Sequence, residues 1–251
     1  MKTVAYTSDS DKLFYSKLDD GITLCEKRRR AYFFSFLSER EQLLACRHLE
    51  SAGFHDYAFD GGYPNAERKI LGLFFYEPEA FPLCAMELCF RKCDKLTHRD
   101  FLGALMSLGI ERETVGDILV EDGRCVIFVK PEIRDYITSQ LFKVGNVGVR
   151  IAGADLESLP KGRGFDEKEY SVSSLRLDAV VAAATGLSRE KTKSVILSGN
   201  VTHNYADCQN ISQAVREKDT ITVRGKGKYV INGVIGETKK HRIKISIIHF
   251  R

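Results

Sequence analysis

Apolar residues follow a helical period through much of the first part of the chain. Between 38 and 53, Ser38 precedes the apolar run and Glu41 follows three positions later, which is the spacing of a capping box. Gly53 supplies the residue type that usually ends a helix. With a short helical stretch expected after a Gly-Gly turn, we predict that residues 1–76 are mostly helical.

The middle of the chain alternates between strand and helix periods. Short apolar runs predict strands, and a 3.6-residue period predicts helices. We expect a strand in 83–90, a helix in 98–110, a hairpin in 117–130 turned by Asp122-Gly123, a helix from Pro131 to Gly145, and a strand in 147–156. The order strand, helix, hairpin, helix, strand indicates a small α+β sandwich over residues 80–155.

A polar stretch at 160–170 reads as a linker, and a third pattern follows it. Apolar positions predict two short helices, one ended by Gly186 and one capped by Ser188 and closed by Gly199. We expect Val195, Ile196 and Leu197 to form the buried side of the second helix. Strands rich in β-branched residues come after them. The fold class is therefore α+β with several domains: a helical domain at 1–76, the sandwich at 80–155, and a module at 173–251.

Composition places the chain among globular proteins, with 43% hydrophobic and 29% charged residues. No apolar run approaches the roughly 20 residues that span a bilayer, so we expect no membrane partner. The first 20 residues lack the apolar centre of a signal peptide, which predicts a cytoplasmic protein. Seven irregularly spaced cysteines do not resemble a disulfide framework.

The net charge of +4 conceals an asymmetry between the two ends. Residues 173–251 hold 14 Lys and Arg against 6 Asp and Glu, a balance of +8, and residues 1–172 hold 24 against 28, a balance of −4. A basic module on a mildly acidic body favours a polyanion partner. A solvated lysine-rich face remains the alternative, because charge alone does not separate the two.

A search for catalytic or metal-binding motifs finds none. The triplet His98-Arg99-Asp100 resembles part of a kinase catalytic loop, but position 105 is Leu where that loop needs Asn. We expect Asp100, or His98, to cap a helix instead. Cys84, Cys89 and Cys93 lack the tight pair of a zinc site and are expected to be ordinary buried thiols.

No P-loop or strand-to-helix glycine loop occurs, and no Ser/His/Asp set follows from spacing. We expect no catalytic residue, no metal and no cofactor.

The remaining candidate function is RNA binding by a basic surface. Arg189, Lys191 and Lys193 lie in the first turns of the helix that Ser188 caps, and a helix N-terminus attracts phosphate. Asn204 is expected in a turn where its amide could meet a base or sugar edge. The positive field should extend over Arg176, Arg224, Lys226, Lys228, Lys239, Lys240 and Arg242. The alternative is a solvated amphipathic helix pair.

The same residues carry a resemblance. Arg176-Leu177-Asp178, Ser188-Arg189, Ile196 to Asn204 and Lys218 to Arg224 resemble the alpha-L RNA-binding domain named after small-subunit ribosomal protein S-four. That resemblance implies binding to structured RNA by shape and phosphate contacts. The domain also occurs on pseudouridine synthases, tyrosyl-tRNA synthetases and rRNA methyltransferases, so it does not by itself distinguish an enzyme from a binding protein.

The whole chain resembles one family more closely. GGYPNAERKI (61–70), HRDFLGALMSLGIERETVGDIL (98–119), VRGKGKY (223–229) and TKKHRIKI (238–245) resemble the YlmH family of bacterial RNA-binding proteins, in the same order. The resemblance implies a helical N-terminal domain, a central domain similar to the RNA-recognition motif, and the alpha-L domain last. It also implies rescue of stalled translation, with binding to the free large ribosomal subunit that carries peptidyl-tRNA.

Three hypotheses follow from these observations. The first is a non-catalytic factor, expected to be a monomer, whose partners are structured rRNA and tRNA on the large ribosomal subunit. The second is an RNA-modifying enzyme of the pseudouridine synthase or methyltransferase type, anchored by the alpha-L domain. The third is a cell-division-associated protein that binds a protein partner through its N-terminal domain. The absence of a recognisable catalytic signature favours the first.

Overall fold

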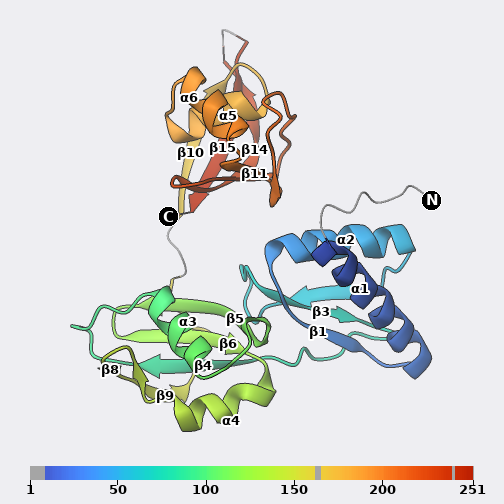
Figure 1. Ribbon diagram of the computed structural model, residues 1–251, viewed down its shortest axis with the longest axis vertical. Helices are drawn as coiled ribbons and strands as arrows, with labels where there is room; N and C mark the ends of the chain where they lie inside the picture. The colour runs from blue at the N-terminus through green and yellow to red at the C-terminus, as the bar shows by residue number, and fades with distance from the viewer. Residues whose placement is uncertain (1–8, 162–164, 239–240, 251) are drawn as a thin grey trace. The chain divides into compact units, whose positions relative to one another are not determined.

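The computed structural model describes residues 9–161, 165–238 and 241–250. The chain forms two compact units, Met1–Gly162 and Arg163–Arg251, which are coloured blue to yellow-green and yellow to red in Figure 1. The first unit holds both segments expected as the N-terminal and central domains. Each unit has its own buried apolar residues.

The first half of unit one combines two helices with a sheet. Its elements are α1 (Asp9–Arg28), β1 (Tyr32–Leu37), α2 (Glu39–Ala52), β2 (Tyr57–Asp60) and β3 (Lys69–Leu73), and the antiparallel sheet has the order β1-β3-β2. The capping box is confirmed, because Glu41 accepts hydrogen bonds from the Ser38 backbone N–H and hydroxyl at 2.7 and 2.6 Å. The helix ends at Gly53, as predicted, with φ 72°.

The prediction of a mostly helical first segment was therefore wrong in part. Residues 32–37 and 69–73 are strands, although their apolar residues do not alternate with polar ones. The reason is burial on both faces: Leu71 and Leu73 pack toward the two helices, whereas Ile70 packs on the opposite side. A strand buried on both faces shows a continuous apolar run that resembles a buried helix in sequence.

The second half of unit one follows the predicted order. It contains β4 (Cys84–Cys89), α3 (His98–Ser107), the single 3₁₀ turn η1 (Arg112–Thr114), β5 (Val115–Glu121), β6 (Arg124–Val129), α4 (Pro131–Gln140), the short pair β7 (Lys143–Val144) and β8 (Val147–Gly148), and β9 (Arg150–Gly153). The sheet order β5-β6-β4-β9 places the first and third strands at the centre. Both helices pack on one face of this sheet, where Phe101, Leu105 and Ile137 are buried.

Several boundaries in this half differ from the prediction. Helix α3 ends at Ser107 and not at 110, and the strand expected at 147–156 is divided into β8 and β9. Helix α4 ends at Gln140 and not at Gly145, because Leu141 leaves the helical region at φ −92° and ψ 88°. Gly145 instead turns the β7–β8 pair with φ 58°. The hairpin at Asp122-Gly123 is confirmed, with Glu121 opposite Arg124.

The two halves of unit one share a core. The sheet face of β5 and β6 that is turned away from α3 and α4 presents Leu119, Val126 and Phe128, which pack against Phe36 and Ile70 of the first half. Phe128 is fully buried and its ring stacks on Tyr63 with centroids 5.1 Å apart. Unit one is consequently layered as helices, sheet, sheet, helices.

A buried carboxylate reinforces that junction. Asp117 on β5, 8% exposed, accepts hydrogen bonds from the Tyr63 hydroxyl at 2.7 Å and from the backbone N–H groups of Glu67 and Arg68 at 2.6 and 3.0 Å. Arg68 in turn donates to the carbonyl oxygen of Phe36 at 2.7 Å. Burial, followed by the hydrogen bond to Asp117, raises the pKa of Tyr63, so the phenol stays protonated and continues to donate.

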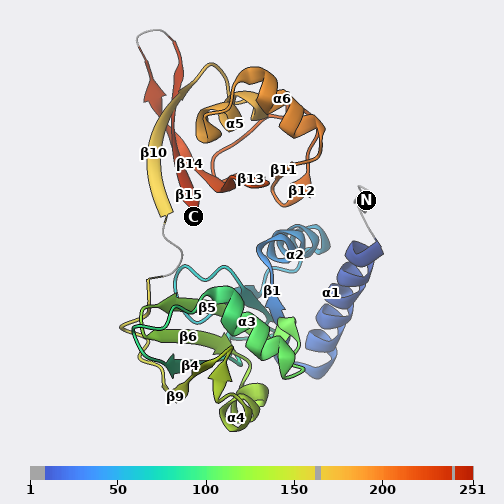
Figure 2. The same cartoon turned by 60° about the vertical axis from the view of Figure 1, so that its left-hand side comes forward.

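Unit two is a sheet with two helices. It contains β10 (Phe165–Val172), α5 (Leu177–Thr185), α6 (Arg189–Leu197), β11 (Val201–His203), β12 (Ala206–Asp207), β13 (Thr220–Val223), β14 (Gly227–Glu237) and β15 (Ile243–Phe250), in the sheet order β10-β15-β14-β13-β11-β12. Figure 2 shows α5 and α6 side by side, and the long β14–β15 pair alongside β10. The core contains Val180, Val181 and Ile196 from the helices and Ile231 and Ile247 from the sheet.

The predicted linker at 160–170 needs correction. Residues 165–172 form β10, which pairs with β15 from end to end. Glu167, Lys168 and Glu169 on this edge strand are exposed, so the apolar alternation that marks a strand is missing. Pairing with β15, more than 70 residues later, is what orders the segment.

Candidate nucleic-acid interface

Helices α5 and α6 are positioned by their buried sides and their caps. Leu177, Val180 and Val181 anchor α5, which ends at Gly186 with φ 71°. Ser188 caps α6 as predicted, with its hydroxyl accepting the Lys191 backbone N–H at 3.4 Å. The helix buries one side chain that the apolar pattern did not suggest, Thr192, whose hydroxyl donates to the Ser188 carbonyl oxygen at 3.0 Å.

The three predicted cations of α6 are all exposed. Arg189 and Lys193 are four residues apart and therefore share one flank of the helix. Lys191 is two residues from each, about 200° around the axis, and lies on the other flank. The helix consequently displays positive charge on both sides of its N-terminal turns, where its dipole is also positive.

The C-terminal side of α6 departs from the prediction. We expected Val195, Ile196 and Leu197 to be its buried side, yet only Ile196 is fully buried and Leu197 is 56% exposed. Three consecutive residues span about 200° of a helix, so they cannot all face one core.

Asn204 does not present a free amide, which corrects the expectation for this residue. Its Nδ2 donates to Asp219 Oδ1 at 2.7 Å, and its Oδ1 accepts the Thr220 backbone N–H at 2.9 Å. Its backbone is in the left-handed region at φ 50°, which asparagine tolerates better than most residues. The side chain therefore holds the corner between β11 and β13.

The carboxylate at the centre of this corner is Asp219, which sequence reasoning did not single out. Besides Asn204, it accepts the Arg216 backbone N–H at 2.7 Å and lies 2.7 Å from His203 Nε2. Burial on its own would raise the pKa of Asp219, but hydrogen bonds from Asn204, Arg216 and His203 outweigh it and lower the pKa. Its signal in the sequence was its place in the stretch from Lys218 to Arg224, which resembles the alpha-L domain.

Arg176 is partly used within the domain. It stands at the start of α5 and forms an ion pair with Asp178, Nε to Oδ1 at 3.1 Å, with 47% of its side chain exposed. Such an exposed pair contributes little to stability. The ion pair with Asp178 therefore holds Arg176 only weakly.

Among the downstream cations that the structure describes, two are exposed on a turn and two contact neighbours within unit two. Arg224 and Lys226 are exposed on the turn between β13 and β14. Lys228 lies over the Phe250 ring, 4.8 Å from its centroid, and Arg242 donates to the Ser171 carbonyl oxygen at 2.5 Å. The predicted contacts Lys239 and Lys240 lie outside the described residues.

The turn that carries Arg224 and Lys226 is fixed by its neighbours. The Lys226 carbonyl oxygen accepts the Tyr229 hydroxyl at 3.0 Å and is 3.1 Å from His249 Nε2. Gly227 has φ 111°, and a side chain there would meet His249 at 2.7 Å. A glycine is required because both the backbone and the packed imidazole exclude a Cβ.

The candidate chemical motifs resolve into structural roles. Asp100 caps α3 as predicted, accepting the Thr97 backbone N–H and hydroxyl at 2.7 Å each, and these hydrogen bonds lower its pKa. Cys84 and Cys89 are partly buried on β4, but Cys93 is exposed, because the strand ends at Cys89. Within the described ranges, no group of three His, Cys, Asp or Glu side chains could hold a metal ion.

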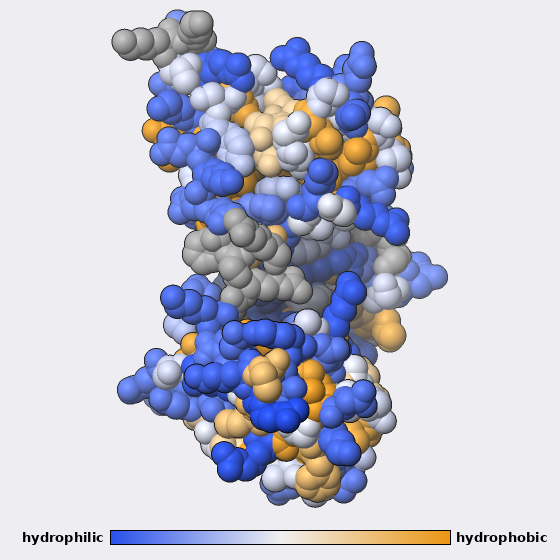
Figure 3. Space-filling view, turned by 90° about the vertical axis from the view of Figure 1, so that its left-hand side faces the viewer, coloured by the Kyte–Doolittle hydropathy of each residue, from blue (hydrophilic) through white to orange (hydrophobic). Residues whose placement is uncertain are grey.

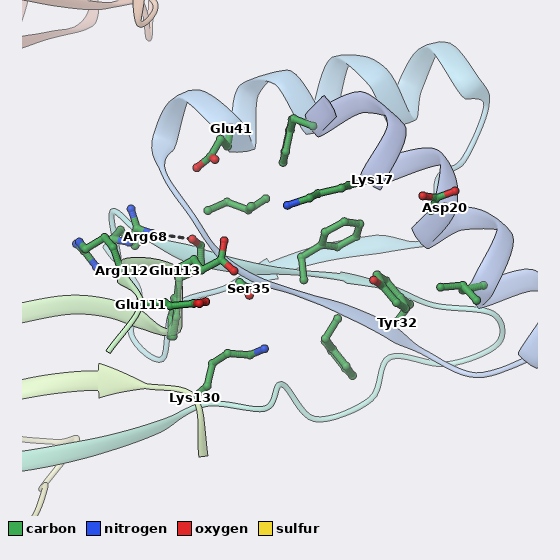
Figure 4. A pocket seen from close by; sticks show the side chains of 16 residues that line it. Lys17, Asp20, Tyr32, Ser35, Glu41, Arg68, Glu111, Arg112, Glu113 and Lys130 are labelled. Carbon is green, nitrogen blue, oxygen red and sulfur yellow. Dashed lines mark hydrogen bonds between the residues drawn. The ribbon is translucent and has the colours of Figure 1, made fainter. Parts of the chain in front are cut away.

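Unit one contains a hollow of about 1090 Å³ along β1, the edge strand of its sheet, between α1 and η1 (Figure 4). Its charged lining is balanced between four cations and four carboxylates: Lys17, Arg68, Arg112, Lys130, Asp20, Glu41, Glu111 and Glu113. Burial and the neighbouring Arg68 lower the pKa of Arg112 to about 10, which still leaves it charged near neutral pH. Arg68 and Arg112 both donate to the carbonyl oxygen of Val115, so these two side chains hold the wall of the hollow.

No helix in the part of the chain that the structure describes is long and apolar enough to cross a bilayer. Figure 3 shows hydrophilic residues over much of the visible face of each unit, with smaller apolar patches between them.

Comparison with known proteins decides the family. The family model described as "Putative RNA-binding domain in YlmH" matches residues 77–158. The chain is 31% identical over 242 residues to the "Ribosome-associated protein quality control protein P2" of Bacillus subtilis (strain 168), covering 94% of each chain. The chain belongs to the YlmH family. The resemblance inferred from the sequence motifs is thereby confirmed.

A solved structure agrees on the fold. The chain is similar to the cell division protein ylmH from Streptococcus pneumoniae, with a TM-score of 0.54 and 20% identity, over 62% of this chain and 97% of that chain. At this level of identity the likeness concerns the fold alone. The mixed α+β, multi-domain fold class is confirmed for this YlmH family member.

Proposed function

We propose that this YlmH family protein is a non-catalytic RNA-binding factor that docks on structured rRNA and tRNA at the large ribosomal subunit. The observation that carries the proposal is the surface of α6, where Arg189, Lys191 and Lys193 are exposed around a capped helix N-terminus. Cations and backbone N–H groups together bind phosphates and fix orientation without reading sequence. RNA helices are recognised largely in this way, by backbone and shape.

The relative from Bacillus subtilis is named as a ribosome-associated quality control protein, and it aligns with nearly the whole of this chain. We therefore assign this protein to the rescue of stalled translation, where it holds peptidyl-tRNA on a large subunit from which the small subunit has separated. Such a role is cytoplasmic, and it requires the protein to hold the tRNA in position rather than to catalyse a reaction. The proposal also treats residues 1–76 and 80–155 as two domains that share a core, and residues 173–251, whose sheet β10 completes, as the alpha-L module.

The test is sedimentation of cell lysate through a sucrose gradient at low salt. It follows the wild type, Arg189→Ala/Lys193→Ala, and a matched control, Arg47→Ala/Arg99→Ala, which removes two exposed arginines from unit one. We expect the wild type and control to migrate with free large subunits and the α6 variant to remain at the top. If all three remain at the top, the ribosomal role is refuted.

Two other outcomes would redirect the assignment. An altered nucleoside in RNA incubated with the protein would identify a modifying enzyme anchored by unit two. Recovery of a division protein with both the wild type and the α6 variant, without ribosomal RNA, would favour the division-associated role.

A further inference from the structure

The face that an RNA-recognition-type sheet normally offers to RNA is occupied in unit one. In such domains the bases stack on the sheet face opposite the two helices. Here Val126 and Phe128 on that face are buried against Phe36 and Ile70. Arg124, at the other end of β6, donates to the Ser158 carbonyl oxygen at 2.6 Å, so the tail of the unit also reaches this strand. Any RNA contact made by unit one must use a different surface.

One surface of unit one has the chemistry for such a contact. Four consecutive cations, Lys27, Arg28, Arg29 and Arg30, end α1 and begin the turn toward β1, and all four are exposed. They are an exception in this part of the chain, since residues 1–172 carry a balance of −4. Within the described structure, none of the four forms an ion pair with a carboxylate. Their charge is therefore available to an external polyanion.

The helix dipole explains only part of this run. Cations in the last turn of a helix are stabilised by the negative C-terminal end, which accounts for Lys27 and Arg28. Arg29 and Arg30 lie beyond the helix. Arg29 also has φ 50°, a conformation in which glycine is usual and other residues cost about 1 kcal/mol. The carboxylate of Glu79 accepts the Ala31 backbone N–H at 3.0 Å.

Aromatic rings continue the surface. The Arg29 guanidinium lies over the Phe75 ring, 6.0 Å from its centroid, and Phe75 contacts Tyr76 edge to face at 4.4 Å. Tyr76 is 72% exposed, the largest exposure among the large hydrophobic side chains that the structure describes. Guanidinium groups beside an exposed ring combine a phosphate contact with a stacking platform, which is how proteins hold unpaired nucleotides.

We propose that Lys27–Arg30 and Tyr76 form a second RNA-binding surface, one that binds a single-stranded or bulged segment of the same RNA that unit two grips. This inference rests on the proposed function, because it assigns unit one a contact with the same class of ligand. Two linked contacts raise the overall affinity by effective concentration, so each one can be weak alone.

The experiment measures binding of the full-length chain to large-subunit ribosomal RNA at several salt concentrations. The variants are Arg28→Ala/Arg29→Ala/Arg30→Ala and the matched control Arg47→Ala/Lys92→Ala/Arg99→Ala, which removes three exposed cations from elsewhere in unit one. Affinity falls as salt rises, and each lost phosphate contact on unpaired RNA makes the slope of log K against log salt less steep by about 0.7. We expect the slope of the arginine-run variant to be less steep by roughly 2 and its affinity to be about tenfold lower. The control should match the wild type.

A second pair of variants tests the ring without changing charge. Tyr76→Ala should weaken binding by about fivefold at every salt concentration, whereas Tyr76→Phe should retain wild-type affinity, because stacking needs only the aromatic face. Arg28→Glu/Arg30→Glu, which leaves Arg29 in its left-handed position, repeats the charge test if the triple variant folds poorly.

The outcomes separate this inference from the proposed function. If Arg189→Ala/Lys193→Ala lowers the slope but the arginine-run and charge-reversal variants do not, the second surface is refuted and the grip of unit two stands. If the wild type does not bind the RNA, both proposals fail. Vesicles of phosphatidylglycerol serve as the remaining probe: loss of vesicle binding in the arginine-run variant, with RNA binding unchanged, would assign the run to a membrane and overturn the inference.

Discussion

Asp219 accepts the hydrogen bonds that hold the corner between β11 and β13 in unit two, and substituting it tests that role. The substitution Asp219→Asn keeps the shape of the side chain but replaces one carboxylate oxygen with an amide nitrogen. Oxygen Oδ1 accepts from Asn204, and Oδ2 accepts from Arg216 and lies beside His203. Whichever way the new amide turns, an N–H group faces another donor.

The magnitude follows from the number and charge of these hydrogen bonds. Each bond to a charged group contributes about 1.5–3 kcal/mol, but contributions within one network are not additive. The Asp219 side chain is 14% exposed, so water compensates part of the loss. We expect local opening to become easier by about 2 kcal/mol, which corresponds to roughly 30-fold faster amide exchange, since about 1.4 kcal/mol is tenfold.

Hydrogen exchange read by mass spectrometry on peptides spanning 199–223 measures this opening directly. The matched control is Asp207→Asn, which makes the same chemical change at an exposed position on β12. We expect exchange in 199–223 to accelerate in Asp219→Asn and to stay near wild type in the control. Equal exchange in the two variants would refute the role assigned to Asp219.

The stability difference between the wild type and Asp219→Asn should also depend on pH in a defined direction. The pKa of Asp219 is held below its ordinary value, so its contribution to stability is present above the unfolded pKa of about 3.9 and is lost as the pH falls through the lower folded value. The difference between wild type and Asp219→Asn should therefore be complete at about pH 6 and shrink below about pH 3.5. A difference that grows on acidification would contradict this assignment.

Three further predictions concern packing and caps. Phe128→Ala should destabilise unit one by about 3–5 kcal/mol, because it empties the core that both halves share. Hydrogen exchange in urea should show amides of both halves losing protection together. Loss of protection confined to residues 80–155 would contradict a shared core. Gly62→Ala should also destabilise unit one, since φ is 89° and the new Cβ would meet the Phe128 ring at 2.5 Å; the thermal midpoint measures this, and an unchanged midpoint would count against the close contact. Ser188→Ala should cost about 1 kcal/mol by removing the α6 cap, whereas Ser188→Asp should retain stability, and exchange of amides 189–193 distinguishes the two.

The sequence by itself determined the caps and turns that depend on residues close together in the chain. The capping box at Ser38 and Glu41, the Asp122-Gly123 hairpin and the Ser188 cap depend on residues within a few positions of one another, and each is found where predicted. Arg189 and Lys193 of α6 belong to the same class, because a four-residue spacing places both on one flank of the capped helix. The family resemblance followed from motifs spread along the chain.

Tertiary structure decided what depends on distant partners. The sequence of strands β1 and β3 predicted a helical segment, because both faces of these strands are buried. The sequence of β10 predicted a linker, because only its pairing with β15 orders its polar residues. The amide of Asn204 looked available until Asp219, 15 positions later, was found to hold it. Hydrogen bonds and burial across such separations leave no periodic trace in the sequence, since they are set by which elements come to lie together and not by the order of residues within one element.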